Sequence, residues 1–195
     1  MRSNLLALGL VLLATSAVAQ MPPRVRGVIQ SVEGNALVVA TPNEGAVRLT
    51  LTDMTGINGL ERRTMADIKD NTFVGATAVK DRNGRWQATE VHIFPESMRG
   101  LGEGHRPWDR PGTTMTNATV DTAVTSVDGQ VVTVKYKGGE KKIVLRPDTT
   151  FLTYVAAEKS ELKPGARVAV TGVVRSGGAV EARRVVVGRD GVIPT

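Results

Sequence analysis

The chain has 195 residues, a formal net charge of +6 and no cysteine. The lack of cysteine excludes disulfide staples and thiolate chemistry, so the fold has to be stabilised by burial alone. The excess of basic residues favours acidic partners, such as nucleic acid, anionic lipid or an acidic polymer.

The first residues, MRSNLLALGLVLLATSAVAQ, have the pattern of an export signal. Arg2 supplies the positive start, residues 5–14 form a short apolar run, and Ala17-Val18-Ala19 fits the small-x-small cleavage rule. The run is shorter than the roughly 20 residues that a membrane span needs. We expect 1–19 to be a signal peptide and the mature chain, without a transmembrane segment, to be periplasmic or secreted. A membrane anchor is the alternative.

The mature part contains an internal repeat. SVEGNALVV at 31–39 matches SVDGQVVTV at 126–134, and DIKDNTFVGATAV from residue 67 matches ELKPGARVAVTGV from residue 161. NGRWQATEV and GGAVEARRV continue the second match without a further gap. A match of this length and order indicates an old duplication.

Each copy predicts the same order of elements. Alternating apolar residues predict two first strands, and EGN between them predicts a tight hairpin turn. AVRLTL predicts a third strand, TMADIKDN a short helical turn, and FVGATAVKD with RWQATEVHIF the last two strands. Three strands, a helical turn and two strands in about 70 residues is the order of a small OB-type barrel.

The prediction is therefore an all-β chain with two tandem small OB-like β-barrels of about five strands each. The first repeat covers 24–95 and the second covers 119–190, and each should be able to fold alone because it carries its own set of strands. Residues 96–118 are expected to form an ordered, Gly/Pro-rich connecting strap, with Trp108 as its anchor between the barrels.

A resemblance follows from ELKPGARVAVTG, from SVDG after a short strand and from the tandem copy. The chain resembles exported bacterial proteins that carry short OB-like domains of unknown function. The segment VHIFPESMRGLGEGHRPWD is similar to a group of them that is often labelled metal ABC transporter permease. The resemblance implies a fold and export rather than an activity. The permease label conflicts with the sequence, because a permease needs several spanning helices.

Enzymatic and nucleic-acid functions are not predicted. The sequence has no G-x-S-x-G elbow, no Walker loop and no H-E-x-x-H, and GLGEG at 100–104 does not open an apolar helix. OB folds bind single-stranded nucleic acid by stacking bases on aromatic side chains, but aromatic residues make up only 4% of this chain. We expect no catalytic residues, no cofactor and no nucleic-acid partner.

Metal binding is an open alternative. The central segment brings His92, Met98, Glu103 and His105 close together in the sequence. Imidazole with thioether suits copper, and imidazole with carboxylate suits zinc. These four residues are the predicted ligands of a divalent metal. However, their spacing matches no ligand motif, and a histidine inside the strand TEVHIF is typical of a structural residue.

Four lysines surround one predicted hairpin of the second repeat: Lys135, Lys137, Lys141 and Lys142. Lysine on an exposed strand edge often blocks aggregation. The functional alternative is a contact with phosphate or carboxylate groups of an anionic partner.

We expect an exported, non-enzymatic binding or structural module of the bacterial cell envelope. Its partners would be an acidic envelope polymer, anionic lipid headgroups or another envelope protein. The alternative is a periplasmic protein that binds copper or zinc through the central His/Met/Glu segment.

Overall fold

A computed structural model describes residues 24–126 and 129–195, so the predicted signal peptide at 1–19 lies outside the described residues. The described chain consists of β-strands and short 3-10 turns, which confirms the predicted all-β class. No helix in these two ranges has the length and apolar character that spanning a membrane requires.

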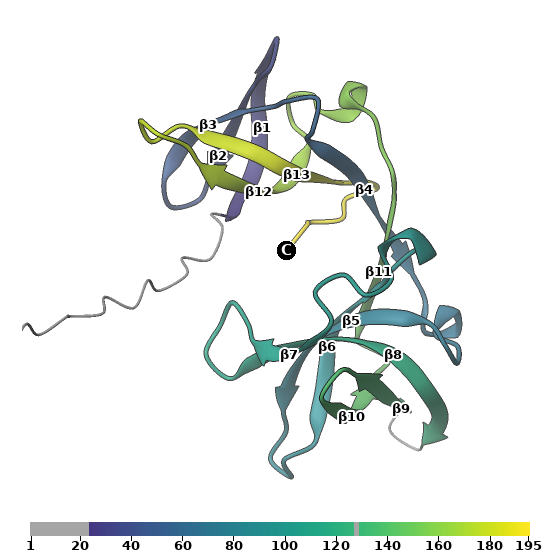
Figure 1. The fold of residues 1–195 in the computed structure, drawn as a ribbon. Helices are drawn as coiled ribbons and strands as arrows, with labels where there is room; N and C mark the ends of the chain where they lie inside the picture. The colour runs from purple at the N-terminus through teal and green to yellow at the C-terminus, as the bar shows by residue number, and fades with distance from the viewer. Residues whose placement is uncertain (1–23, 127–128) are drawn as a thin grey trace, which may run out of the picture.

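The first of two small barrels, the terminal barrel, is built from both ends of the described chain (Figure 1). Its strands are β1 (Arg24–Glu33), β2 (Ala36–Thr41), β3 (Gly45–Thr50), β12 (Arg167–Val174) and β13 (Val180–Gly188). β1, β2 and β3 form an antiparallel meander, and Gly34, with φ of 60°, makes the predicted first turn. β12 pairs with β1, and β13 closes the barrel by pairing in parallel with β3.

The second barrel, the central barrel, uses the middle of the chain. Its strands are β5 (Phe73–Lys80), β6 (Trp86–Ile93), β8 (Thr113–Ser126), β9 (Gly129–Tyr136) and β10 (Gly139–Leu145). β8, β9 and β10 form the meander, β5 pairs with β8, and β6 closes the barrel by pairing in parallel with β10. Both barrels therefore have the predicted OB-like layout of a three-stranded meander closed by a two-stranded hairpin.

The barrels do not coincide with the repeats. The first three strands of the first repeat are completed by the last two strands of the second repeat, and the reverse holds in the central barrel. The predicted domains 24–95 and 119–190 are therefore wrong as separate barrels, although both repeats exist. The reason is that each chain segment leaves its own meander in an extended strand and crosses to the other barrel.

The two crossing strands are β4 (Gly56–Arg63) and β11 (Thr150–Ala156). β4 runs parallel to β13, β11 runs parallel to β6, and the two pair with each other antiparallel (Figure 1). They hold the same place in the two repeats, and Leu60 lies opposite Tyr154. An antiparallel pair of equivalent strands defines a pseudo-two-fold axis, which here passes between these two residues.

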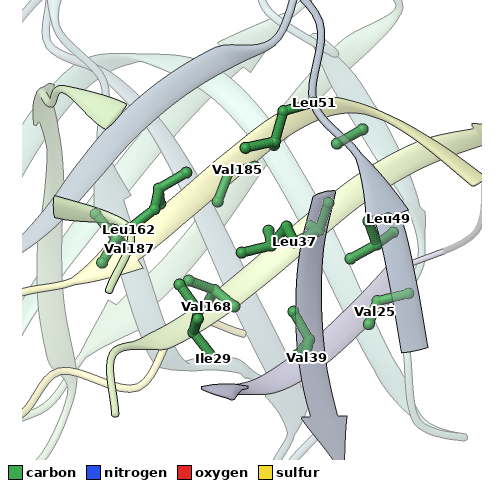
Figure 2. Packing of buried hydrophobic residues seen from close by; sticks show 12 residues of the cluster. Val25, Ile29, Leu37, Val39, Leu49, Leu51, Leu162, Val168, Val185 and Val187 are labelled. Atoms are coloured by element: carbon green, nitrogen blue, oxygen red, sulfur yellow. The ribbon is translucent and has the colours of Figure 1, made fainter. Parts of the chain in front are cut away.

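Each hydrophobic core mixes residues of both repeats. In the terminal barrel, Leu37 and Val39 pack with Val168 and Val185, as Figure 2 shows. In the central barrel, side chains of β5 and β6 pack in the same way against those of β8, β9 and β10. Burial of a Val or Leu side chain contributes about 1.5–3 kcal/mol, so neither barrel can keep its core without strands from the other repeat.

The predicted helical turns are present as 3-10 turns, η1 (Met65–Asp67) and η3 (Lys159–Glu161). Each is followed by a buried aliphatic residue: Ile68 packs into the central core and Leu162 into the terminal core. Each turn therefore belongs with the two strands that follow it, on the far side of the crossing.

The predicted strap at 96–118 is more than a connector. It contains η2 (Glu96–Met98), β7 (Gly104–Pro107) and the beginning of β8. β7 and β8 form an antiparallel hairpin on the central barrel, in a register that pairs Arg106 with Met115. The loop of this hairpin, residues 108–112, reaches β1 of the terminal barrel, where Asp109 accepts hydrogen bonds from Arg24 and Arg26.

The exchange of strands predicts the behaviour of an isolated repeat. A chain of residues 24–95 holds β1–β3 and β5–β6, which lie in different barrels, so it should fold only by pairing with a second copy. We expect a homodimer whose melting temperature rises with protein concentration. The control is residues 24–195, in which the partner strands are tethered and the melting temperature should not depend on concentration. A compact monomer of 24–95 with a cooperative melt, measured by sedimentation and circular dichroism, would contradict the exchanged arrangement.

Candidate functional site

A cleft lies between the two barrels. Its volume is about 820 Å³, within the range of small-molecule sites. The walls come from β1, β2 and β12 on one side and from β5 and β6 on the other, and the hairpin loop and residues 193–195 line it as well. The charged residues of the lining are Arg26, Glu90, Asp109, Arg110 and Arg167.

A smaller space of about 250 Å³ continues this cleft, and we call it the inner chamber. Arg26, Trp108 and Thr195 line both spaces. The inner chamber has one wall from the central barrel and one from the terminal barrel, so it exists only because the crossing strands hold the barrels together.

The central-barrel wall is a row of three residues on neighbouring strands. His92 on β6 pairs with Gly75 on β5, which in turn pairs with Asn117 on β8. Paired residues of adjacent strands point to the same face of a sheet. The polar side chains of His92 and Asn117 therefore flank Gly75, which has no side chain. A Cβ atom on Gly75 would lie 2.8 Å from Oδ1 of Asn117, and glycine is therefore needed for this packing.

The terminal-barrel wall contains the corresponding row. Val186 on β13 pairs with Ala169 on β12, which pairs with Arg26 on β1. All three residues line the inner chamber. The chamber thus lies between the same three positions of the two barrels, near the pseudo-two-fold axis, but the chemistry of the two walls differs.

The central-barrel wall has hydrogen-bonding capacity that the protein does not use. His92 is 5% exposed and Asn117 is 6% exposed, and Nδ1 of His92 and Oδ1 of Asn117 have no hydrogen-bond partner among the described residues. The amide is oriented, because Nδ2 of Asn117 donates to the carbonyl of Leu101 at 2.8 Å. A buried polar atom without a partner costs about 1–3 kcal/mol. These two atoms are therefore the natural contacts for a bound molecule.

The orientation of His92 is set by Glu90. The carboxylate of Glu90 accepts hydrogen bonds from Nε2 of His92 and from the Thr195 hydroxyl, both at 2.7 Å. Burial raises the pKa of Glu90, but the hydrogen bond and charge of His92 and the bond from Thr195 outweigh it and hold the pKa below its ordinary value. Glu90 is thus an anion that fixes the proton of the ring on Nε2 and leaves Nδ1 directed away from it.

Four arginines line the inner chamber: Arg24, Arg26, Arg106 and Arg184. Arg24 and Arg26 share the carboxylate of Asp109 at 3.3 and 2.5 Å. Among the residues that the structure describes, Arg184 forms no ion pair. Burial, followed by the charge of Arg24, lowers the pKa of Arg106. Four guanidinium groups against Asp109 and Glu90 leave the chamber with surplus positive charge.

Tyr154 covers the chamber at the crossing strands. Its ring stacks on His92 with centroids 5.2 Å apart and lies 5.5 Å from the ring of Phe94. Burial raises the pKa of Tyr154 to about 12, because the phenolate would lose its hydration. The phenol is therefore neutral at physiological pH.

Trp108, the predicted anchor of the strap, lies at the hairpin tip and is half-buried. The guanidinium of Arg24 lies 4.1 Å from the centre of its ring and that of Arg106 lies 5.4 Å away. Cation–π contacts of this kind contribute roughly 0.5–1 kcal/mol at exposed sites. Trp108 thus bridges the central-barrel hairpin to β1, and it also lines both parts of the cleft.

The predicted metal ligands do not come together. His92 faces the inner chamber, whereas Nδ1 of His105 lies 2.8 Å from the Thr116 hydroxyl. Thr116 and Asn117 are neighbours on β8 and point to opposite faces of the sheet, so the two histidines lie on opposite sides of it. Glu103 instead accepts a hydrogen bond from the backbone of Lys137, and Met98 lies in η2. Nowhere in residues 24–126 and 129–195 do three His, Cys, Asp or Glu side chains form a group that could hold a metal ion.

The four lysines do not form one surface. Lys135 pairs with Asp121 at 2.8 Å, and register places Lys142 on the same outer side of the hairpin. Lys141 lies instead near the ring of Trp86, with 5.7 Å between its ammonium and the ring centre. Burial and the charge of Lys141 together lower the pKa of His105 in the same cluster.

The sequence did not point to Gly75, Asn117, Arg26 and Arg184 as neighbours. They meet through strand pairing within the barrels and across the cleft, and no spacing along the chain records such contacts. One signal was available at Gly75, because a glycine inside a strand often marks a close approach of backbone or ligand.

The raised pKa of Tyr154 predicts a pH-dependent stability. The folded protein keeps the phenol neutral up to about pH 12, whereas in the unfolded chain it ionises near pH 10. This contribution is complete below about pH 10 and is lost as the pH rises toward 12. The free energy of unfolding, measured in urea at about pH 9 and 11.5, should fall less in Tyr154→Phe than in the parent. The parent at the same two pH values is the reference, and equal falls in parent and Tyr154→Phe would contradict the prediction.

Comparison with known proteins identifies the repeats. Residues 26–92 and 122–186 each match the family described as Domain of unknown function (DUF5666). This match gives no support to the metal ABC transporter permease label. No curated protein and no solved structure matches the chain. Because the two matches together cover more than half of its residues, the chain belongs to the DUF5666 family, with two tandem copies of the domain.

Proposed function

We propose that this chain is an exported, non-enzymatic binding module of the bacterial cell envelope, and that it holds a segment of an acidic polymer in the cleft between its barrels. The observation that carries this proposal is the cleft itself: about 820 Å³ of space, continued by an inner chamber lined by four arginines. The formal net charge of +6 adds long-range attraction for a polyanion.

The outer part of the cleft is available to an anion. Arg110 and Arg167 line it, and neither forms an ion pair within the described ranges. The backbone N–H of Arg110 donates to the Thr113 hydroxyl, and this hydroxyl donates to the Arg110 carbonyl, so these bonds do not involve the guanidinium group. Guanidinium groups bind carboxylate and phosphate in a bidentate manner, so these two side chains supply contacts at the entrance while the inner chamber supplies those at the end.

The recessed position of the arginines favours a polymer segment over a lipid surface. The arginines of the inner chamber lie between two barrels and beneath the hairpin loop that carries Trp108. A membrane surface meets the protein as a plane and cannot reach into such a space, whereas a narrow chain can enter it. A binding site at a junction between two domains is also a common location for ligands.

The polar groups of the cleft fit binding better than catalysis. Glu90, His92 and Thr195 bring together an acid, an imidazole and a hydroxyl. The hydroxyl donates to the carboxylate and not to the ring. A nucleophile needs its base within hydrogen-bond reach, and here the base that Thr195 touches is a carboxylate whose pKa is held low. This arrangement orients the imidazole and leaves the hydroxyl unactivated.

The proposal predicts salt-sensitive binding that depends on the cleft arginines. The probes are polygalacturonate, polyglycerol phosphate and phosphatidylglycerol vesicles, with affinity measured by thermophoresis at low and high salt. The double variant Arg110→Gln/Arg167→Gln should lower the affinity for a polymer about tenfold, since each exposed charge contact contributes up to about 1 kcal/mol.

The matched control is Arg48→Gln/Arg183→Gln, which removes the same charge from outside the cleft, where these residues pair with Glu33 and Glu181. It should keep the affinity within about twofold. Equal losses in both variants would mean that only net charge attracts the polymer. Binding to vesicles alone would move the function to a lipid surface, and either result would reject the cleft as the site.

A further inference from the structure

We propose that the inner chamber recognises a hydroxylated carboxylate, and specifically one uronic-acid residue of an acidic saccharide. This proposal rests on the proposed function, because the polymer in the outer cleft would place that residue in the chamber. It is carried by the different chemistry of the two chamber walls.

The central-barrel wall requires a hydrogen-bond donor. Oδ1 of Asn117 is an acceptor fixed in place by the bond from Nδ2 to Leu101. Nδ1 of His92 carries a lone pair when the ring is neutral and a proton when it is charged. A hydroxyl group can donate to Asn117 and can either donate to or accept from His92, so two neighbouring hydroxyls satisfy both buried atoms in either state of the ring.

The terminal-barrel wall requires an anion. Arg26 has an unpartnered, buried Nε, and Arg184 has no ion pair within the described chain. Arg24 and Arg26 already share Asp109, and Arg106 donates to the carbonyl of Gly102. Of the four chamber arginines, Arg184 is therefore the one for which the described residues supply neither an ion pair nor a hydrogen bond. A carboxylate between Arg184 and Arg26 would take up these donors as charge-assisted hydrogen bonds, which are about twice as strong as neutral ones.

Other small ligands fit only one wall. A phosphodiester or a plain carboxylate offers acceptors alone and would leave Oδ1 of Asn117 opposite another oxygen. An ammonium group could donate to Asn117, but the surplus of arginines around the chamber opposes a cation. A neutral sugar satisfies the central-barrel wall and leaves Arg184 without an anion. A molecule that carries both hydroxyls and a carboxylate is the class that satisfies both walls.

The connection between the two spaces fits a residue of a chain rather than a free monosaccharide. Arg26 and Trp108 line both the outer cleft and the inner chamber. A polymer segment lying in the outer cleft would thus pass Trp108 before its residue reaches His92 and Asn117. Aromatic side chains supply the apolar contact that ligand sites combine with a few placed polar groups.

The test compares digalacturonate with four probes: digalactose, which lacks the carboxylates, and cyclohexanecarboxylate, dimethyl phosphate and alanine, which lack the hydroxyls. Affinities are measured by calorimetry on the chain of residues 24–195. We expect digalacturonate to bind about tenfold or more tightly than any of the others, because each lost charged or buried hydrogen bond weakens binding by that order.

Two variants locate the binding. Arg184→Gln should weaken digalacturonate binding about tenfold or more and leave the melting temperature unchanged, because Arg184 forms no ion pair with the residues that the structure describes. Arg183→Gln is its matched control, since this neighbouring residue lies at the bulge of β13, is exposed, does not line the cleft or the chamber and pairs with Glu181; its affinity should stay that of the parent. The chain has only two histidines, so imidazole ¹⁵N spectra, assigned with His105→Gln, should show the Nδ1 signal of His92 moving on binding.

Several results would overturn the proposal. Equal affinity for cyclohexanecarboxylate or dimethyl phosphate would remove the hydroxyl requirement, and tight binding of alanine would assign the chamber to an amino acid. An unmoved His92 signal, or equal effects of Arg184→Gln and Arg183→Gln, would place the saccharide elsewhere. If polygalacturonate still depended on Arg110 and Arg167 while digalacturonate failed to bind, this inference would fail and the proposed function would stand.

Discussion

The antiparallel pair of β4 and β11 is the contact on which the rest of the structure depends. Each of these strands carries its repeat from one barrel to the other, so the pairing decides which strands complete which core. A small cluster of Leu60, Leu152 and Val192 packs at this crossing. Arg189 adds ion pairs at 2.7 Å to Glu61 on β4 and to Glu161 in η3. Separating the crossing strands would therefore open both barrels together.

Fusion of the repeats explains why such an exchange is stable in one chain. Two separate copies would have to meet in solution before their strands could pair, whereas tandem copies hold each other at a high effective concentration. The exchange also ties both barrels through two crossing segments and a β-sheet instead of one flexible linker. The cleft and the inner chamber gain fixed walls from this arrangement, and a fixed wall is what a selective binding site needs.

Much of this fold could be predicted from the sequence, because it depends on local pattern. Alternating apolar residues and EGN gave the first strands and their turn, and the order of elements gave the OB-like layout of each barrel. Partner choice could not be predicted, because both repeats carry the same alternation and a strand of either fits the same barrel position. The site depends on which strands pair. His92 is a predicted metal ligand from the sequence, but its contact with Glu90 and its place beside Gly75 depend on register.

The pseudo-two-fold axis shows what the duplication made possible. In a symmetric dimer of one repeat, identical residues would face each other across the axis, so a cleft with Glu90 on one side would have Glu90 on the other. In the fused chain, Arg184 occupies the position in the second repeat that Glu90 occupies in the first. Arg26 likewise occupies the position in the terminal-barrel wall that Asn117 occupies in the central-barrel wall. Independent substitution in two tethered copies can thus place acceptors on one wall and cations on the opposite wall. A site that distinguishes the two ends of a ligand requires this asymmetry, and a symmetric dimer cannot supply it at its axis.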